Sequence, residues 1–355
     1  MYSWRQVARD GTCNRASTIH SRSILVGRIL AFAFLTLVVF WAVAFIAFIV
    51  RVASLFIGTA AIPLPSSLLT SAGFLQELTE ALFVFVIPLS AALLLAVGIA
   101  YRHQSVPASS KSSWMDWKNP KVVVAITAWN DEEAIRETIR EFSAQDHVIE
   151  TIVVDNNSGD HTAIVAKEQG ARVVIEPKPG YGNVCIRGLR EALGCEEANI
   201  VVLAEGDMTF RASDMAKMIP YLEDVDMVVG TRTTYELTDA DSQMDWFLSW
   251  GNLFLATLIR LRYWDPVFLG RVRLTDVGCT FRVMRKNSLE AVIGQLHVGD
   301  SHFSPHMILA AIRAKLRIIE VPIKFRKRVG VSKGAGSSRI RAIRIGARMI
   351  AEILR

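Results

Sequence analysis

The chain has 355 residues, enough for one large domain or two of ordinary size. Apolar residues make up 51% of it and the mean hydropathy is +0.31, which is high for a wholly soluble protein, and the excess lies before residue 101. The net charge of +6 and the basic clusters near both ends favour an anionic membrane surface as a partner. We expect no nucleic-acid binding and no structural zinc site, because the sequence has no zinc-finger, RNA-recognition or basic-zipper pattern and its four cysteines are scattered.

Two long runs without a charged residue, 29–50 and 81–100, precede the rest of the chain. Each is long enough to cross a hydrocarbon core of ~30 Å. Arginines precede the first run, and Arg102 and Lys111 follow the second, so both ends of the hairpin are expected in the cytoplasm. A cleaved signal peptide is the alternative, but the first run is long for one and no A-x-A site follows it. We predict a multi-pass inner-membrane protein with a basic N-terminus at 1–28, a transmembrane hairpin at 29–101 and a polar linker at 102–120.

After the linker, short β-branched runs alternate with segments of helical spacing. Alternation of this kind predicts an α/β domain with a mainly parallel sheet and flanking helices, here over 121–337. The expected strands are 121–127, 151–154, 172–175, 199–203 and 226–230. The expected helices are 131–145, one from about 161, 184–193 and one ending near 221.

Acidic and amide side chains follow three of these strands. They are Asn130 and Asp131, then Asp155 to Asn157, and then Glu205 with Asp207. Ligands of such sheets bind beyond the carboxyl ends of the strands, so we expect these groups to meet at one site. The sequence contains neither a GxGxxG nor a Walker A motif, which argues against a dehydrogenase and a P-loop ATPase.

Six segments in this part of the chain carry a family resemblance. They are ITAWNDEEAI, VVDNNSGDHT, AEGDMTF, MVVGTR, TDVGCTFRV and VPIKFRKRVGVSK. From 121 to about 333 the chain resembles family-2 glycosyltransferases of the GT-A fold, in particular the dolichol-phosphate-mannose-synthase-like branch. It departs from the family pattern at Thr127, Trp129, Asn156 and Glu205. The resemblance implies inverting transfer of a sugar from a UDP- or GDP-sugar to a polyprenyl phosphate on the cytoplasmic face of the membrane.

The resemblance also implies roles for the residues on the donor side. Asp207 is expected to be catalytic and, with Glu205, to bind Mg²⁺ or Mn²⁺, because a divalent cation offsets the charge that develops on the leaving diphosphate. The side chains and backbone expected to contact the nucleotide-sugar are Asn130, Asp131, Asp155, Asn157, Gly182 and Glu205.

On the acceptor side, Asp276 aligns with the family's acidic residue beside the acceptor. It would be a general base for a hydroxyl acceptor. A phosphate acceptor, with a second pKa of ~6, needs little deprotonation, so positioning is then the expected role. Cations are needed to bring two anionic substrates together, and the candidates for the acceptor phosphate are Arg232, Arg282, Arg328 and Lys333.

Two amphipathic segments are expected to face lipid. The first, 244–262, places Phe247, Trp250 and Phe254 on one stripe, and the second, 338–355, reads as a basic interfacial helix with Ile340 and Ile343 on its apolar face. Packing against the catalytic domain, or against another copy in a homo-oligomer, is the alternative for both stripes.

Two other functions remain open at this point. One is transfer to a hydroxyl of a glycolipid or a polysaccharide, although the Q-x-x-R-W pattern of processive synthases is absent, since MDW follows Gln243. The other is a membrane scaffold that has lost catalysis.

Overall fold

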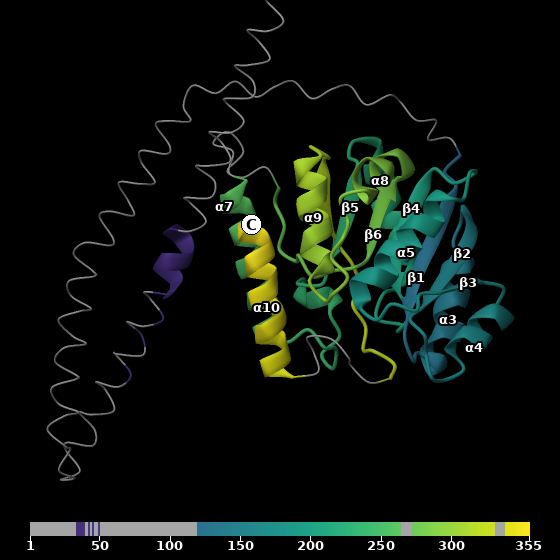
Figure 1. The fold of residues 1–355 in the computed structure, drawn as a ribbon, viewed down its shortest axis with the longest axis horizontal. Helices are drawn as coiled ribbons and strands as arrows, with labels where there is room; N and C mark the ends of the chain where they lie inside the picture. The colour runs from purple at the N-terminus through teal and green to yellow at the C-terminus, as the bar shows by residue number, and fades with distance from the viewer. Residues whose placement is uncertain are drawn as a thin grey trace, which may run out of the picture. The chain divides into compact units, whose positions relative to one another are not determined.

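The structure is a computed structural model that describes residues 33–39, 42, 45, 49, 119–263, 272–330 and 338–355. From residue 119 onward these residues form one seven-stranded sheet with helices around it, in the order β3-β2-β1-β4-β6-β5-β7 (Figure 1). The mostly parallel α/β sheet predicted from the sequence is confirmed.

Four neighbouring strands are parallel to one another. They are β1 (Val122–Ala128), β2 (Val148–Asp155), β3 (Arg172–Ile175) and β4 (Ile200–Glu205). Every residue of β1 is buried, as expected of a continuous β-branched run in the middle of a sheet covered on both faces. The carboxyl ends of β1, β2 and β4 therefore lie at the same edge of the sheet.

The other half of the sheet is mixed. Strand β5 (Met227–Thr231) is parallel to β7 (Ile318–Pro322), whereas β6 (Arg282–Arg285) is antiparallel to both β4 and β5. The sequence analysis predicted β5 and neither β6 nor β7. Strand β6 has only four residues, with an arginine at each end, and so lacks the apolar run by which the longer strands are identified.

The helices that connect strands β1 to β4 agree with the predicted positions to within a few residues. They are α3 (Glu132–Ser143), α4 (Thr162–Glu168) and α5 (Tyr181–Leu193). The helix expected to end near 221 is instead three short turns, η1 (Ala212–Asp214), α6 (Met215–Met218) and η2 (Ile219–Glu223). Pro220 near the start of η2 is compatible with this break, because proline cannot continue an α-helix hydrogen-bond ladder.

Beyond β5 the described residues include five further helices. They are η3 (Tyr235–Leu237), α7 (Trp246–Arg262), α8 (Lys286–Ile293), α9 (Phe303–Arg313) and α10 (Arg339–Leu354). Helices α7 and α10 lie side by side, and the Arg339 guanidinium stacks on Trp246 and Phe247 (Figure 1). A buried pair between His306 of α9 and Glu352 of α10, 2.9 Å apart, holds α10 against the domain.

The face of α10 that packs on the domain is not its predicted apolar stripe. Ala342, Ile345 and Ile353 are buried, whereas Ile340 and Ile343 of the predicted stripe are 73% and 60% exposed. The start of the stripe is therefore left uncovered by the part of the domain that the structure describes, whereas Ile350 further along it is half-buried. The predicted stripe of α7 is likewise only partly buried, because Leu258 is buried whereas Trp250 is 69% exposed.

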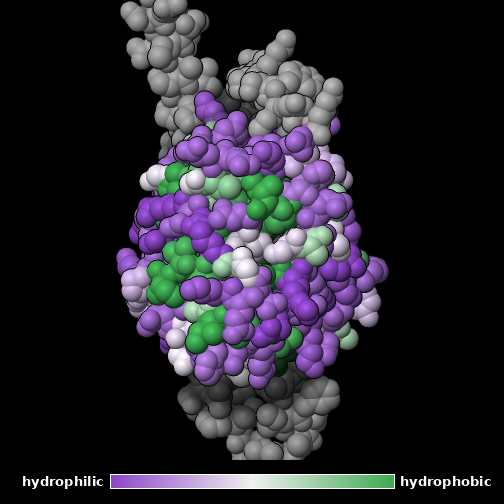
Figure 2. Space-filling model, turned by 90° about the vertical axis from the view of Figure 1, so that its right-hand side faces the viewer, coloured by the Kyte–Doolittle hydropathy of each residue, from purple (hydrophilic) through white to green (hydrophobic). Residues whose placement is uncertain are grey.

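The face seen in Figure 2 is mainly hydrophilic, with hydrophobic side chains in separate patches. Of the predicted transmembrane hairpin, the span 81–100 lies outside the described residues, and of the span 29–50 only 33–39 and three single positions are described. Within the described residues, no helix combines the length and the apolar character needed to cross a membrane.

Candidate active site

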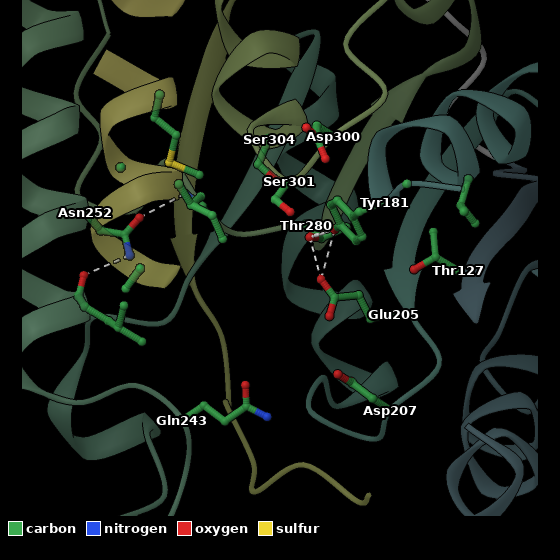
Figure 3. Close-up of a pocket in the computed structure, with 18 of the residues that line it drawn as sticks. Thr127, Tyr181, Glu205, Asp207, Gln243, Asn252, Thr280, Asp300, Ser301 and Ser304 are labelled. Atoms are coloured by element: carbon green, nitrogen blue, oxygen red, sulfur yellow. Dashed lines mark hydrogen bonds between the residues drawn. The ribbon is translucent and has the colours of Figure 1, made fainter. Parts of the chain in front are cut away.

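A cavity of about 940 Å³ lies at the carboxyl ends of the strands. One end is polar, with carboxylates from the loops after β1 and β4 and arginines from the segments after β5 and β7. The other end is formed by α7 and α10 and is mainly apolar, with Asn252 as a polar member. Figure 3 shows Glu205 and Asp207 on one side of this cavity and Gln243 and Asn252 on the opposite side.

The backbone is in the left-handed region directly after three strands. The residues are Asn130 (φ 51°), Asn157 (φ 57°) and Met208 (φ 65°), which follow β1, β2 and β4. Asparagine tolerates this conformation, whereas an unbranched apolar residue such as Met208 adopts it at a cost. Such strain is concentrated at functional sites, where the surrounding structure holds it in place.

Asp207 lines the cavity although almost its whole side chain is buried. Its Oδ1 accepts from the backbone N–H and hydroxyl of Thr209, and its Oδ2 lies 2.8 Å from Nη1 of Arg328. Burial, together with the negative charge of Glu205, raises the pKa of Asp207 to about 6, although Arg328 opposes the shift. The mutual repulsion of these two carboxylates, one of them buried, favours the binding of a cation.

Glu205 is held by two side chains that the sequence analysis did not identify. Its Oε1 accepts from the Tyr181 hydroxyl at 2.9 Å and from the Thr280 hydroxyl at 2.7 Å, and the two hydroxyls also contact each other (Figure 3). Tyr181 begins α5 and Thr280 precedes β6, so the network joins segments 99 residues apart. The longer side chain at the position where the family usually has aspartate is thus fixed in one orientation.

Asp131 precedes α3 but does not cap it through its side chain. Its Oδ2 accepts from the Trp129 N–H at 2.9 Å, and its Oδ1 accepts from Nη2 of Arg328 at 3.0 Å. Arg328 therefore bridges Asp131 and Asp207, two residues from different motifs. Both carboxylates line the cavity, as does Trp129, which is 47% exposed.

Asp155 and Asn130 do not line the cavity, in contrast to Asn157. Asp155 is buried and accepts from both the N–H and the hydroxyl of Ser158, which makes it the anchor of a turn. Asn130 accepts through Oδ1 from the Gly159 N–H at 2.8 Å. Both residues shape the loops around the cavity, and the contacts observed here are structural.

The glycines at the start of α5 are required by close packing. A Cβ on Gly182 would lie 2.0 Å from the carbonyl oxygen of Val298, and Gly180 has a φ of 124° that favours glycine. Gly182 is absent from the cavity wall, whereas Gly180 is part of it. The sequence analysis assigned Gly182 to the nucleotide-sugar; the structure places it against the loop at 298–299.

Arg232 follows β5 and lines the cavity. Its Nε donates to Oδ2 of Asp276 at 2.7 Å and its Nη2 donates to Oδ1 at 2.9 Å. Burial alone would lower the pKa of Arg232, but the charge of Asp276 raises it above its usual value. Asp276 itself is 0% exposed, and its two carboxylate oxygens accept hydrogen bonds from Arg232 and Gly278. The structure therefore gives no support to Asp276 as a group that touches the acceptor.

The prediction for Arg282 as a phosphate ligand is corrected by the structure. Its side chain is 1% exposed and donates to the carbonyl oxygens of Cys279 and Ser304. A group enclosed in this way braces the loop and cannot reach a substrate phosphate. Lys333 lies outside the described residues.

The apolar end of the cavity extends from the carboxylates toward the helices that carry exposed aromatic and aliphatic side chains. From α7 and α10 it includes Phe247, Leu248, Phe254, Leu255, Ile343, Ile345, Met349 and Ile350. The sequence analysis identified only part of this wall, because its residues come from segments about 100 positions apart.

The carboxylates predicted to hold a metal, Glu205 and Asp207, both line the cavity. In the part of the chain that the structure describes, no group of three or more His, Cys, Asp or Glu side chains is arranged to hold a metal ion. A cation at this site would need further ligands from outside the protein.

Comparisons with known proteins agree with the fold and indicate the family. Residues 123–293 match the model of glycosyl transferase family 2. An uncharacterised glycosyltransferase of Mycobacterium tuberculosis is 30% identical over 222 residues, which are 61% of this chain and 91% of that protein. A dolichyl-phosphate hexose transferase of Haloferax volcanii is 25% identical over 214 residues, 60% of this chain and 86% of that protein.

Among solved structures, the chain resembles glucosyl-3-phosphoglycerate synthase of Mycobacterium tuberculosis in complex with Mn²⁺, UDP and glucosyl-3-phosphoglycerate. The TM-score is 0.50 at 18% identity, over 67% of this chain and 80% of that one, which establishes a shared fold. Together with the family match and the 30% identical relative, these findings identify the chain as a glycosyltransferase of family 2, with the GT-A fold.

Proposed function

We propose that this glycosyltransferase moves a sugar from a nucleotide-sugar to a polyprenyl phosphate at the cytoplasmic surface of a membrane. The observation that carries the proposal is the composition of the cavity, which is polar at the strand ends and mainly apolar along α7 and α10. A lipid phosphate has the same two parts, an anionic head and a hydrocarbon chain. The dolichyl-phosphate hexose transferase of Haloferax volcanii, at 25% identity, supports the same choice of acceptor.

The donor's diphosphate belongs at the polar end, beside Asp207 and Glu205. Asp207 is buried and Glu205 is half-buried, and Oδ2 of Asp207 already pairs with a positive charge on Arg328. These two carboxylates fit a divalent cation, since Mg²⁺ and Mn²⁺ take water and phosphate oxygens as their remaining ligands. Such an ion, when bound, offsets the negative charge that grows on the departing diphosphate. The glucosyl-3-phosphoglycerate synthase of the same fold was solved with Mn²⁺ and UDP, which supports this assignment.

The protein's own groups contribute positioning and charge. Arg232 and Arg328 bring positive charge to a cavity that must hold two anions, and Arg can bind a phosphate through two hydrogen bonds. In the proposed step an oxygen of the acceptor phosphate attacks the anomeric carbon, the bond from that carbon to the diphosphate breaks, and the nucleoside diphosphate leaves. No base is required, because the acceptor phosphate is already ionised near neutral pH.

A membrane surface is the proposed setting of the reaction. Trp246 and Trp250 of α7 are 70% and 69% exposed, beside the uncovered start of the α10 stripe. Arginines at 341, 344 and 348 lie on the same helix. Exposed tryptophans and arginines next to an apolar stripe are typical of a helix that lies in the interface of an anionic bilayer.

A hydroxyl acceptor would need a general base near the reacting oxygen. Asp276 is the aligned candidate, and its oxygens are fully engaged by Arg232 and Gly278. This observation favours the phosphate acceptor over the glycolipid or polysaccharide hydroxyl.

A donor screen tests the proposal. Membranes that contain the full chain are supplied with UDP- and GDP-sugars and with undecaprenyl or dolichyl phosphate, and the lipid product is analysed. We expect a product that mild acid cleaves, as it cleaves an anomeric phosphate, and a loss of at least ~100-fold in turnover with Asp207→Ala.

The matched control is Asp241→Asn, an exposed carboxylate paired with Lys327 at 2.9 Å, which should leave turnover within about twofold. An acid-stable product would indicate a hydroxyl acceptor. Absence of product with every donor, together with no binding of any donor in calorimetry, would favour the scaffold.

A further inference from the structure

A half-buried carboxylate outside the cavity, Glu320, is linked to the cavity wall through two other residues. It lies on β7, next to Val229 of the parallel strand β5, and none of the six sequence motifs assigns it a function. Its carboxylate accepts from the Thr275 N–H at 2.8 Å, from the Thr275 hydroxyl at 2.8 Å and from the Asp276 N–H at 2.8 Å. One side chain therefore fixes the backbone of two consecutive residues.

The segment that Glu320 holds has no regular secondary structure of its own. Residues 272–281 lie between α7 and β6 without forming a helix or a strand, so their position depends on contacts made by side chains. Thr275 is held from a second side, because its hydroxyl is within 3.0 Å of the hydroxyl of Thr231 and 2.8 Å of that of Thr233. Both of those residues are at the end of β5, directly before and after Arg232.

Asp276 transmits this fixed position to Arg232. Its two oxygens hold the Nε and Nη2 of Arg232 in a two-point contact, and Oδ2 also accepts from the Arg232 N–H at 3.1 Å. Gly278 makes room for the pair, because a Cβ there would lie 3.0 Å from Nη2 of Arg232. The guanidinium also lies over the Phe325 ring, 5.3 Å from its centroid. Arg232 can thus take one orientation at the cavity wall.

We propose that Glu320 is a positioning residue for the transfer reaction, which holds Thr275 and Asp276 so that Asp276 presents Arg232 to the anionic group of the acceptor. The proposal rests on the phosphate acceptor proposed above. It assigns Asp276 a positioning role as well, one contact closer to the substrate. Glu320 affects binding of the acceptor and leaves binding of the donor unchanged, because the donor carboxylates Asp131 and Asp207 are held by other groups.

The hydrogen bonds of Glu320 predict different effects for two substitutions of this residue. Glutamine can keep its Oε1 as the acceptor for both backbone N–H groups and can donate from its amide nitrogen to the Thr275 hydroxyl. Alanine removes every contact to 275 and 276. Conservative replacement should therefore preserve the position of Arg232, and truncation should lose it.

The test is steady-state kinetics of the full chain in membranes, with undecaprenyl phosphate as the varied acceptor and the donor identified in the screen above. We expect Glu320→Ala to raise the acceptor KM about tenfold, with the donor KM and kcat within about twofold. Glu320→Gln should stay within about twofold of wild type in all three constants. The matched control is Glu150→Gln, a glutamate of β2 paired with Arg172 at the surface, which should change none of them.

Each outcome bears on the proposal separately from the choice of acceptor. Wild-type protein that transfers no sugar to the lipid phosphate overturns the proposed function, and this inference with it. Transfer by wild type with an unchanged acceptor KM in Glu320→Ala overturns the inference alone, as does an equal change in the acceptor and donor KM values.

If Glu320→Ala does not accumulate as folded protein, the variant Thr275→Val tests the proposal instead. It removes one hydrogen bond to Glu320 and keeps both backbone N–H groups, and we expect a rise of about threefold in the acceptor KM. An acceptor KM equal to that of wild type in this variant overturns the proposal.

Discussion

The two ends of the cavity are built in different ways. The donor end is made of loops that follow successive strands of one parallel unit, so that Asp131 and Asp207 come to the same edge of the sheet through the topology itself. The acceptor end is assembled from segments far apart in the chain, with Arg232 held by Asp276 and the apolar wall formed by α7 and α10. One end is specified by local sequence and strand order, and the other by long-range contacts.

The largest predicted effect is that of removing the proposed metal ion from the donor end. Excess chelator should lower turnover at least ~100-fold by abolishing charge stabilisation at the donor end. Binding of the lipid acceptor to the α7–α10 wall should persist, because no carboxylate of the metal site forms that wall. Turnover before and after addition of Mn²⁺, and tryptophan fluorescence of the protein with added lipid, measure the two effects. Turnover that survives chelation would show that the donor end does not depend on a metal ion.

Arg232→Lys is expected to have an intermediate effect, confined to the acceptor end. Lysine keeps the charge but loses the planar two-point contact with Asp276, so the acceptor KM should rise about 30-fold while the donor KM changes less than about twofold. Arg136→Lys, at an exposed arginine that pairs with Glu168 at 3.4 Å, is the matched control. Equal changes in both KM values would mean that the two ends do not act separately.

The smallest predicted effect concerns stability as a function of pH. Burial raises the pKa of Glu320 from 4.5 to about 7 in the folded protein, against hydrogen bonds from Asp276 and Thr275 that lower it. The folded state then binds the proton more tightly than the unfolded state, so this contribution to stability is complete below about pH 4.5, falls as the pH rises to about 7 and is constant above.

The difference between the two ends of that range is about 3 kcal/mol at most, since one pKa unit corresponds to about 1.4 kcal/mol. Thermal unfolding of the detergent-purified full chain, wild type against Glu320→Gln, measures it between pH 4.5 and 8. The two curves should diverge as the pH rises, with wild type losing more stability. Parallel curves would show that Glu320 does not titrate in this range.

The sequence was informative where a residue's role depends on its neighbours in the chain. Strand β3 was predicted at its observed bounds, and the polar groups after β1 and β4 were expected to meet because parallel strands end at a common edge. Strand β6 and the partners of Glu205 were not predicted, because Tyr181 and Thr280 are ordinary residues until the fold brings them together. The same reason explains Arg282, whose burial between two backbone carbonyls depends on the packing of β6 and α9.

The bridge that Arg328 makes between Asp131 and Asp207 has a consequence for how tightly a donor can bind. A metal–nucleotide bound at Oδ2 of Asp207, as proposed above, would take the place of this guanidinium, which would then be available to the phosphates. The donor affinity would then reflect the difference between two charge pairings of similar kind. Such an exchange would favour product release, because the departing nucleotide would leave behind carboxylates that regain Arg328 as a partner.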